Sequence, residues 1–385
     1  MLQQQPKIYL DFNSKAPVHS YVKQALFDYL SSDENRELAN PSSIHEAGRS
    51  ARSLDRSARD SVIGSLHLDL KQFSLNWTSS GTEANQWVIR TALVHLLKKK
   101  ENPIWAVATD VHDSVRSMIP FWEEQGGKVT LIPVDSHGVC DFSSIDSADF
   151  ISVLWVNNET GVIQSLKPFA HLQNEKPLLH IDAAQSWGKL CPQTEEHLKV
   201  FDYITLSGHK RGAPTGIGAV VRKSPLSPWI LGHQEGDLRG GTENLLGIVG
   251  MKAASEIQFD STHVEEFRNQ LQFQILSLDP RIEVFGKESS RVGHTLFFGC
   301  EVWADHAVPY LDLHGFEVSS GSACSSGSVD ASPVLLSMGK SPLMARSGIR
   351  ISLPSDPNDC IFQESEVWVP RFIEAIKGLL GNRVS

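Results

Sequence analysis

Lys210 is the residue around which the candidate chemistry gathers. It lies in segment 201–212, which opens with strand-forming residues at 203–206 and breaks at Ser207. A lysine at the end of a buried strand, beside small hydrogen-bonding residues, is well placed to be fixed by hydrogen bonds rather than exposed to solvent. Taken alone, the pattern also fits a surface lysine after a strand, so the other polar positions of the chain must decide.

Further polar side chains follow expected strands at their carboxyl ends. His112 comes after 104–109, Asn158 after 151–156, and Asp182 and Gln185 after 178–181. Ligands bind at the carboxyl ends of strands in mostly parallel sheets, so we expect these side chains to share one pocket with Lys210.

The order of the expected elements predicts an α/β fold. Strands and helical stretches alternate, which indicates a mostly parallel sheet with helices on both faces. No G-x-G-x-x-G follows the first strand, and the glycines at 212–218 lead into a strand, which argues against a dinucleotide-binding fold. The expected strands are 75–78, 104–109, 129–134, 151–156, 178–181, 203–206 and 218–221.

A lysine that forms a Schiff base, together with an acid that pairs with a pyridinium nitrogen, is typical of a pyridoxal 5'-phosphate site. Lys210 and Asp182 supply this pair. We expect Gln185 to donate to the ring oxygen, and His112 to stack on the ring and transfer protons. Each residue alone also fits a structural role, as a cap or a buried polar side chain.

A phosphate is expected at the start of a long helix. The strand at 75–78 ends in a small-residue turn that contains Gly81 and Thr82, and a helix begins there. Backbone N–H groups and the helix dipole at such a turn favour an anion. Ser207 and His209 follow the strand at 203–206 and are expected to complete the phosphate site.

Composition narrows the class of protein. The chain of 385 residues has a net charge of −10, which argues against a nucleic-acid-binding surface. The amino terminus lacks the basic and apolar regions of a signal peptide, and no long apolar run predicts a membrane span, so we expect a cytoplasmic protein. The five cysteines are widely scattered, which predicts neither a metal site nor a disulfide framework.

The pattern changes beyond about residue 250. A helix at 253–277 is followed by short strands at 282–285, 294–298 and 316–319, a serine- and glycine-rich block around Cys324, a strand at 348–353 and a helix at 367–380. This order predicts a smaller α+β domain. We therefore expect a large domain at 15–250 and a small domain that combines 1–14 with 251–385 and carries the cysteine loop.

The motifs and their order resemble those of the cysteine desulfurases, pyridoxal phosphate enzymes of the class V aminotransferase group. The resemblance spans nearly the whole chain. The matching segments are IYLD at 8–11, NPSSIH at 40–45, TSSGTE at 78–83, VNNETG at 156–161, HIDAAQS at 180–186, LSGHK at 206–210, QE at 234–235, RGGTEN at 239–244, residues 318–327 and IRISL at 349–353.

The resemblance implies fold type I of the pyridoxal phosphate transferases, with a seven-stranded sheet and a smaller α+β domain. It also implies a homodimer and roles for particular residues. Lys210 would bond the cofactor; Asn158, Asp182 and Gln185 would contact its ring; Gly81, Thr82, Ser207, His209 and, from a second subunit, Thr242 would bind its phosphate; Arg350, with Asn158, would bind the substrate carboxylate.

The implied reaction removes sulfur from L-cysteine. Lys210 would move the Cα proton, and Cys324 would take the sulfur as a persulfide while L-alanine is released. A polar, exposed loop suits a reactive thiol. The persulfide would pass to an acceptor protein, for iron–sulfur cluster assembly or for thiolation.

The chain also differs from the family pattern around the expected substrate entrance and partner surface. The differing positions are Lys15, Gly236-Asp237, Gly293-His294 and 354–357. Two other functions therefore stay open. One is another class V enzyme, such as a selenocysteine lyase or an aminotransferase, and the other is a non-catalytic binding or assembly subunit.

Overall fold

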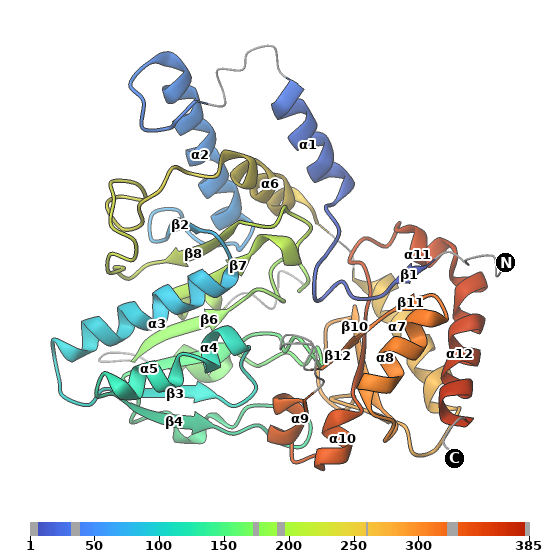
Figure 1. Ribbon diagram of the computed structural model, residues 1–385. Helices are drawn as coiled ribbons and strands as arrows, with labels where there is room; N and C mark the ends of the chain where they lie inside the picture. Colours follow the sequence, from blue (N-terminus) through green and yellow to red (C-terminus); the bar gives the residue numbers. More distant parts are fainter. Residues whose placement is uncertain are drawn as a thin grey trace.

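The computed structural model describes residues 7–31, 39–171, 177–190, 197–258, 261–321 and 330–381. A large α/β part carries the central sheet, and a smaller part with its own sheets lies beside it (Figure 1). Among the described residues, no helix is long and apolar enough to cross a membrane.

The central sheet has seven strands in the order β2-β8-β7-β6-β5-β3-β4. Strand β8 runs antiparallel to β2 and β7, and the other pairs are parallel. The mostly parallel seven-stranded sheet is therefore confirmed. Its strands are β2 (Ser74–Thr78), β3 (Ile104–Ala108), β4 (Lys128–Ile132), β5 (Phe150–Leu154), β6 (Leu178–Asp182), β7 (Tyr203–Ser207) and β8 (Gly218–Arg222).

In the described part of the chain, α-helices connect the first strands of this sheet along the sequence and not the later ones. Among the described residues, α-helices separate β2 from β3 and β3 from β4, whereas the later strands are joined by short 3-10 helices and turns. The expected regular alternation of strands and helices is not seen in this described part of the chain, where turns and 3-10 helices take the place of α-helices. The helices of this part are α1 (Ser20–Ser31), α2 (Glu46–Gly64), α3 (Gly81–Leu97), α4 (Asp113–Arg116), α5 (Ile119–Glu124) and α6 (Leu245–Glu256).

The smaller part contains two short sheets. Strand β1 (Ile8–Tyr9) pairs with β11 (Phe316–Glu317), and a four-stranded sheet has the order β12-β13-β10-β9. Its strands are β9 (Glu283–Val284), β10 (Thr295–Gly299), β12 (Ser319–Ser320) and β13 (Ile349–Ser352). Its helices are α7 (Thr262–Leu276), α8 (Ala304–Leu313), α9 (Pro333–Ser337), α10 (Pro342–Arg346), α11 (Cys360–Gln363) and α12 (Ser365–Gly381).

The single helix expected at 253–277 is two helices. Helix α6 ends at Glu256 because Ile257, its C-cap residue, is extended at φ −79° and ψ 129°. Helix α7 starts again at Thr262, after Ser261 as its N-cap residue.

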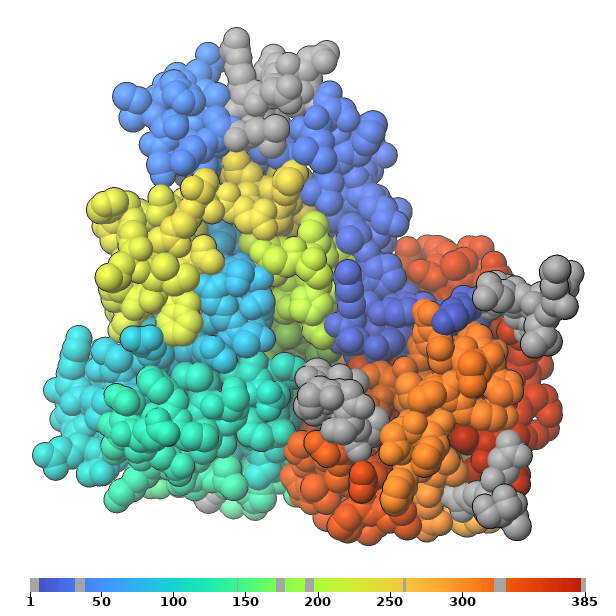
Figure 2. Space-filling view, viewed as in Figure 1, coloured from blue at the N-terminus to red at the C-terminus, as the bar shows by residue number. Residues whose placement is uncertain are grey.

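Buried apolar side chains form two clusters. One surrounds the central sheet, and the other fills the smaller part around Phe298, Ile351 and Trp368. The first cluster also includes Phe297 and Val334 from the smaller part. In Figure 2 the blue amino-terminal segment runs from the large part to the orange and red smaller part. The expected domain boundaries at 14/15 and 250/251 stay a prediction.

A buried carboxyl group joins the two parts. Glu159 lies beyond β5, and its Oε2 accepts a hydrogen bond of 2.5 Å from Ser332 Oγ, at the start of α9. A Cβ atom at Gly321 would lie 2.5 Å from the same oxygen, so a larger residue here would displace the Glu159 carboxyl group. Burial raises the pKa of Glu159 to about 7, although the Ser332 hydrogen bond and Arg350 oppose this shift.

This raised pKa predicts a pH dependence of stability. Between pH 4.5, the ordinary pKa of the group, and about 7, the folded chain holds a proton that the unfolded chain has lost, so ionisation of Glu159 weakens folding as the pH rises. In Glu159→Gln this loss is absent. We expect the Tm of the wild type, relative to that of the variant, to fall between pH 5 and pH 8. The exposed Glu124→Gln is the control, and parallel curves for wild type and Glu159→Gln would contradict the assignment.

Candidate active site

Asp182 ends β6 and is buried at 4% exposure. Its Oδ2 accepts a hydrogen bond of 2.8 Å from Asn85 Nδ2, and its Oδ1 accepts one of 2.9 Å from the backbone N–H of Ala184. Donors on both oxygens fix the orientation of the carboxyl group. A buried, oriented carboxylate suits a protonated ring nitrogen.

His112 caps the short helix α4 that follows β3. Its Nδ1 accepts from the backbone N–H of Ser114 at 3.1 Å and lies 2.9 Å from Ser114 Oγ. Burial lowers the pKa of His112, Asp182 opposes that shift and Lys210 adds to it. The ring is thus a neutral imidazole at neutral pH, which suits both stacking and proton transfer.

Lys210 ends the short 3-10 helix after β7, and its amine is held by the amino-terminal segment. Its Nζ donates to the backbone oxygens of Asn13 at 2.6 Å and Ser14 at 2.8 Å. Gln185 Nε2 donates to the same Asn13 oxygen at 2.9 Å, and Gln185 Oε1 accepts from Lys189 Nζ at 2.7 Å. The predicted Lys210 and Gln185 therefore meet at one carbonyl group.

Asn13 was not foreseen as a site residue. It is 2% exposed, its Nδ2 donates to the Asn158 backbone oxygen at 3.2 Å and to Thr295 Oγ1 at 2.9 Å, and its backbone N–H donates to Ser352 Oγ at 2.8 Å. In the sequence it stands out only as part of a turn. Its contacts join residues more than a hundred positions apart, which no local pattern predicts.

The expected phosphate residues also come together. Helix α3 begins at Gly81, whose neighbour Thr82 is exposed, and a Cβ atom at Gly81 would lie 3.0 Å from Ser207 Cβ. Ser207 Oγ lies 3.1 Å from His209 Nδ1. Burial and the nearby Lys210 lower the pKa of His209 to about 4, so its ring is a neutral hydrogen-bonding group at neutral pH.

These residues fit pyridoxal phosphate by their chemistry. A helix amino terminus without a side chain at Gly81, a serine and a neutral histidine suit a phosphate, and a buried carboxylate suits the ring nitrogen. An amine on the next strand end suits the covalent bond. Gly81 and Thr82, Ser207 and His209, Asp182, Gln185 and Lys210 would hold the cofactor.

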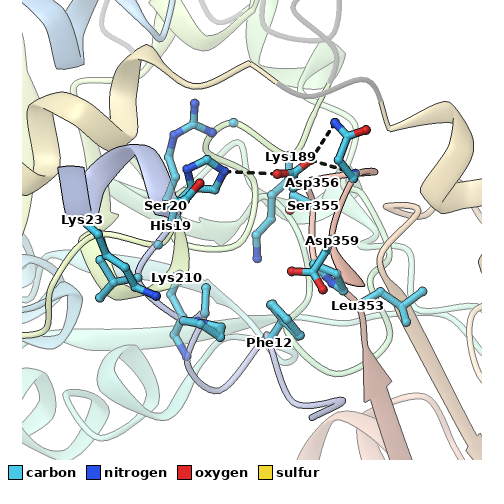
Figure 3. A pocket seen from close by; sticks show the side chains of 18 residues that line it. Phe12, His19, Ser20, Lys23, Lys189, Lys210, Leu353, Ser355, Asp356 and Asp359 are labelled. Carbon is cyan, nitrogen blue, oxygen red and sulfur yellow. Dashed lines mark hydrogen bonds and ion pairs between the residues drawn. The ribbon is translucent and has the colours of Figure 1, made fainter. Parts of the chain in front are cut away.

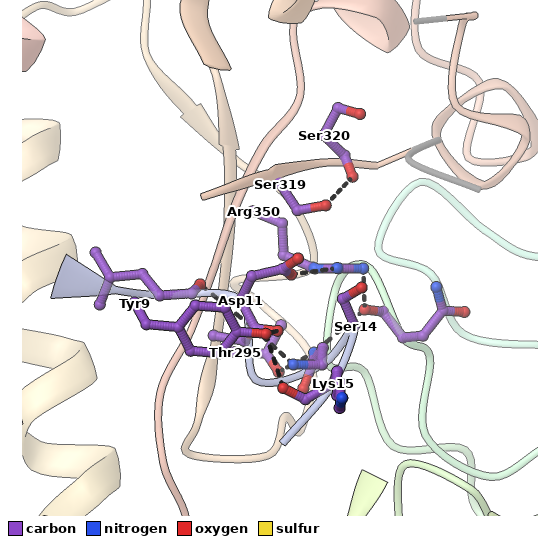
Figure 4. Close-up of polar contacts among 12 residues, drawn as sticks. Tyr9, Asp11, Ser14, Lys15, Thr295, Ser319, Ser320 and Arg350 are labelled. Atoms are coloured by element: carbon purple, nitrogen blue, oxygen red, sulfur yellow. Dashed lines mark hydrogen bonds and ion pairs between the residues drawn. The ribbon is translucent and has the colours of Figure 1, made fainter. Parts of the chain in front are cut away.

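Arg350 lies on β13, in the smaller part, and is 4% exposed. Its Nη2 donates to Asp11 Oδ1 at 2.8 Å and its Nη1 donates to the Asn158 backbone oxygen at 3.1 Å (Figure 4). Its Nε is buried without a partner among the described residues. The guanidinium group is thus preoriented beside Asn158, as a carboxylate-binding site requires.

Two cavities are lined by predicted site residues. One of about 340 Å³ is lined by Phe12, Lys189, Lys210 and Asp359, among others (Figure 3). The other, of about 200 Å³, is lined by His112, Asn158, Glu159 and Gly321, among others. The second also touches both flanks of the segment that contains Cys324.

Two of the predicted site residues have no contact with these residues in the described part of the structure. Cys324 lies outside the described residues. Thr242 is exposed on the loop before α6. On the same loop Glu235, with φ +53°, accepts from Arg59 Nη2 at 2.7 Å and from the Trp77 backbone N–H at 3.0 Å, which anchors the loop to β2.

Comparison with known sequences identifies the family. The profile of the Aminotransferase class-V family matches residues 8–356. A cysteine desulfurase of Nostoc sp. is 32% identical over 392 aligned residues, covering 97% of this chain and 94% of the relative. The cysteine desulfurase NifS of Azotobacter vinelandii is 32% identical, covering 90% of this chain and 87% of the relative.

Solved structures agree with this assignment. A NifS-like protein superposes with a TM-score of 0.83 at 25% identity, covering 97% of this chain and 99% of that chain. A NifS-like protein from Rickettsia africae gives a TM-score of 0.81, also at 25% identity, with coverage of 97% and 99%. The chain therefore belongs to the aminotransferase class-V family and, within it, to the cysteine desulfurases.

Proposed function

We propose that this chain binds pyridoxal 5'-phosphate and converts L-cysteine into L-alanine, leaving the sulfur as a persulfide on Cys324. The observation that carries the proposal is the convergence of Lys210, Asp182 and His112 from the carboxyl ends of β7, β6 and β3. A similar fold is seen in SspA solved in complex with cysteine, at a TM-score of 0.74 and 26% identity. That complex supports cysteine as the substrate.

The cofactor, when bound, supplies an electron sink for the substrate carbanion. Lys210 provides the amine that attaches it and afterwards takes the Cα proton. Asp182, whose two oxygens are oriented by Asn85 and Ala184, would favour the protonated ring nitrogen through its negative charge. Gln185 Nε2 has a second hydrogen beyond the one given to Asn13, and this hydrogen is available to the ring oxygen.

Arg350 and Asn158 position the substrate carboxylate. A guanidinium group binds a carboxylate through two parallel hydrogen bonds, and Asp11 holds Arg350 ready for this. Cys324 then attacks the substrate sulfur as a thiolate. An S–S bond forms, the substrate Cβ–S bond breaks, and its electron pair leaves with Cβ, which is protonated to give alanine.

We also propose a homodimer in which Thr242 contacts the phosphate bound by the second subunit. The exposure of Thr242 supports this arrangement. An acceptor protein for iron–sulfur cluster assembly or thiolation would take the sulfur from Cys324. The cytoplasm is the proposed location, on the grounds of composition.

Two variants separate cofactor binding from sulfur transfer. Lys210→Ala is expected to lose the visible absorbance of covalently attached cofactor, whereas Cys324→Ala keeps it. Alanine formation from cysteine should fall by on the order of a thousandfold in Cys324→Ala, because the nucleophile is removed. Cys360→Ala, which removes an exposed cysteine, is the control. Alanine and sulfide formed at the wild-type rate by Cys324→Ala would contradict the persulfide mechanism.

Substrate binding is tested by Arg350→Lys. Lysine cannot form the paired hydrogen bonds, so the KM for cysteine is expected to rise by about tenfold or more. Arg281→Lys is the matched control, because Arg281 also pairs with a carboxylate, Asp279, but at the surface. An unchanged KM in Arg350→Lys would remove Arg350 from the substrate site.

A further inference from the structure

A buried asparagine links Asp182 to His112. Asn85 lies on α3, a helix that packs against the central sheet, and is 2% exposed. Its Nδ2 donates to Asp182 Oδ2 at 2.8 Å and to Ser114 Oγ at 2.8 Å. Ser114 Oγ in turn lies 2.9 Å from His112 Nδ1. One amide group therefore contacts the carboxylate directly and the imidazole through one hydroxyl group.

The directions of these hydrogen bonds are determined by which groups can donate. The backbone N–H of Ser114 can only donate, and it points to His112 Nδ1, so this nitrogen carries no proton. The Ser114 hydroxyl group must then donate to Nδ1 while it accepts from Asn85. The remaining proton of the neutral ring of His112 is consequently on Nε2.

A second set of contacts fixes the amide of Asn85. Thr205 Oγ1 donates to Asn85 Oδ1 at 2.5 Å, and it lies 3.2 Å from His180 Nε2. Burial lowers the pKa of His180 to about 3, so this ring carries one proton. The Thr205 hydroxyl group gives its one proton to Asn85, so it can only accept from His180, and the His180 proton lies on Nε2. Ser152 Oγ, 3.1 Å away, then donates to the unprotonated Nδ1. From Ser152 to His112, each group in this series of hydrogen bonds donates to the next one.

We propose that Asn85 is a positioning residue, which holds the Asp182 carboxylate and the His112 ring as one hydrogen-bonded unit and restricts proton exchange by His112 to Nε2. This inference rests on the proposed cofactor site. It deepens that site, because it states which nitrogen of His112 can exchange a proton and which residue fixes this choice.

The first test needs neither cofactor nor substrate. The full-length protein is labelled with ¹⁵N-histidine, and the His112 signals are identified by their loss in His112→Gln. The wild type should show a single tautomer at neutral pH, with unprotonated Nδ1 and protonated Nε2. In Asn85→Ala the Ser114 hydroxyl group is no longer oriented, and the His112 signals should shift toward a mixture of tautomers or broaden.

The second readout is the Kd for pyridoxal phosphate, followed by absorbance. Loss of a hydrogen bond to a buried charged group is expected to raise this Kd by about tenfold in Asn85→Ala. Gln86→Ala, at the next position of α3, is the matched control and should leave both readouts unchanged. If Asn85→Ala does not fold, Thr205→Val carries the test, because it removes the donor to Asn85 Oδ1, together with the acceptor of His180 Nε2, and leaves Asn85 itself in place.

Two results would overturn the inference. One is a wild-type His112 with its proton on Nδ1, and the other is an Asn85→Ala protein with wild-type ¹⁵N signals and a wild-type Kd. A third outcome separates the two proposals. If Asn85→Ala changes the His112 signals of the apoprotein as expected, but the wild-type enzyme releases no alanine from cysteine, the proposed reaction is contradicted and the role of Asn85 stands.

Discussion

The parallel pairing of β5, β6 and β7 is the constraint on which the site depends. Because these strands run in the same direction, the residues that follow them emerge at one edge of the sheet. The polar groups there lie within a buried part of the molecule, where an unpaired donor or acceptor is costly. Each must therefore find a partner, and those partners fix the geometry.

The amino-terminal segment provides several of these partners. Asn13 contacts Lys210 and Gln185 from the large part and Thr295 and Ser352 from the smaller part. The two parts of the chain are thus held together at the same point that holds the reactive amine. Arg350 and Glu159 make comparable connections on the side where the substrate is proposed to bind.

Local patterns in the sequence were sufficient for much of the fold. Strand-forming runs located all seven strands of the central sheet, and several of the polar residues predicted after them lie in one hydrogen-bonded region of the structure. The connections after β4 and the break between α6 and α7 were not predicted, because a helical pattern in the sequence does not show where tertiary packing makes the chain turn. Asn13 and Asn85 were missed, since their roles arise from contacts between distant segments.

The central claim is that sulfur from cysteine becomes covalently bound to Cys324. Mass spectrometry of the protein after one turnover with L-cysteine, followed by digestion under non-reducing conditions, tests this most directly. The account predicts that the peptide containing Cys324 gains the mass of one sulfur atom and that a reductant removes it. Alanine release with an unmodified Cys324 peptide, or with the added sulfur on another cysteine, would contradict it.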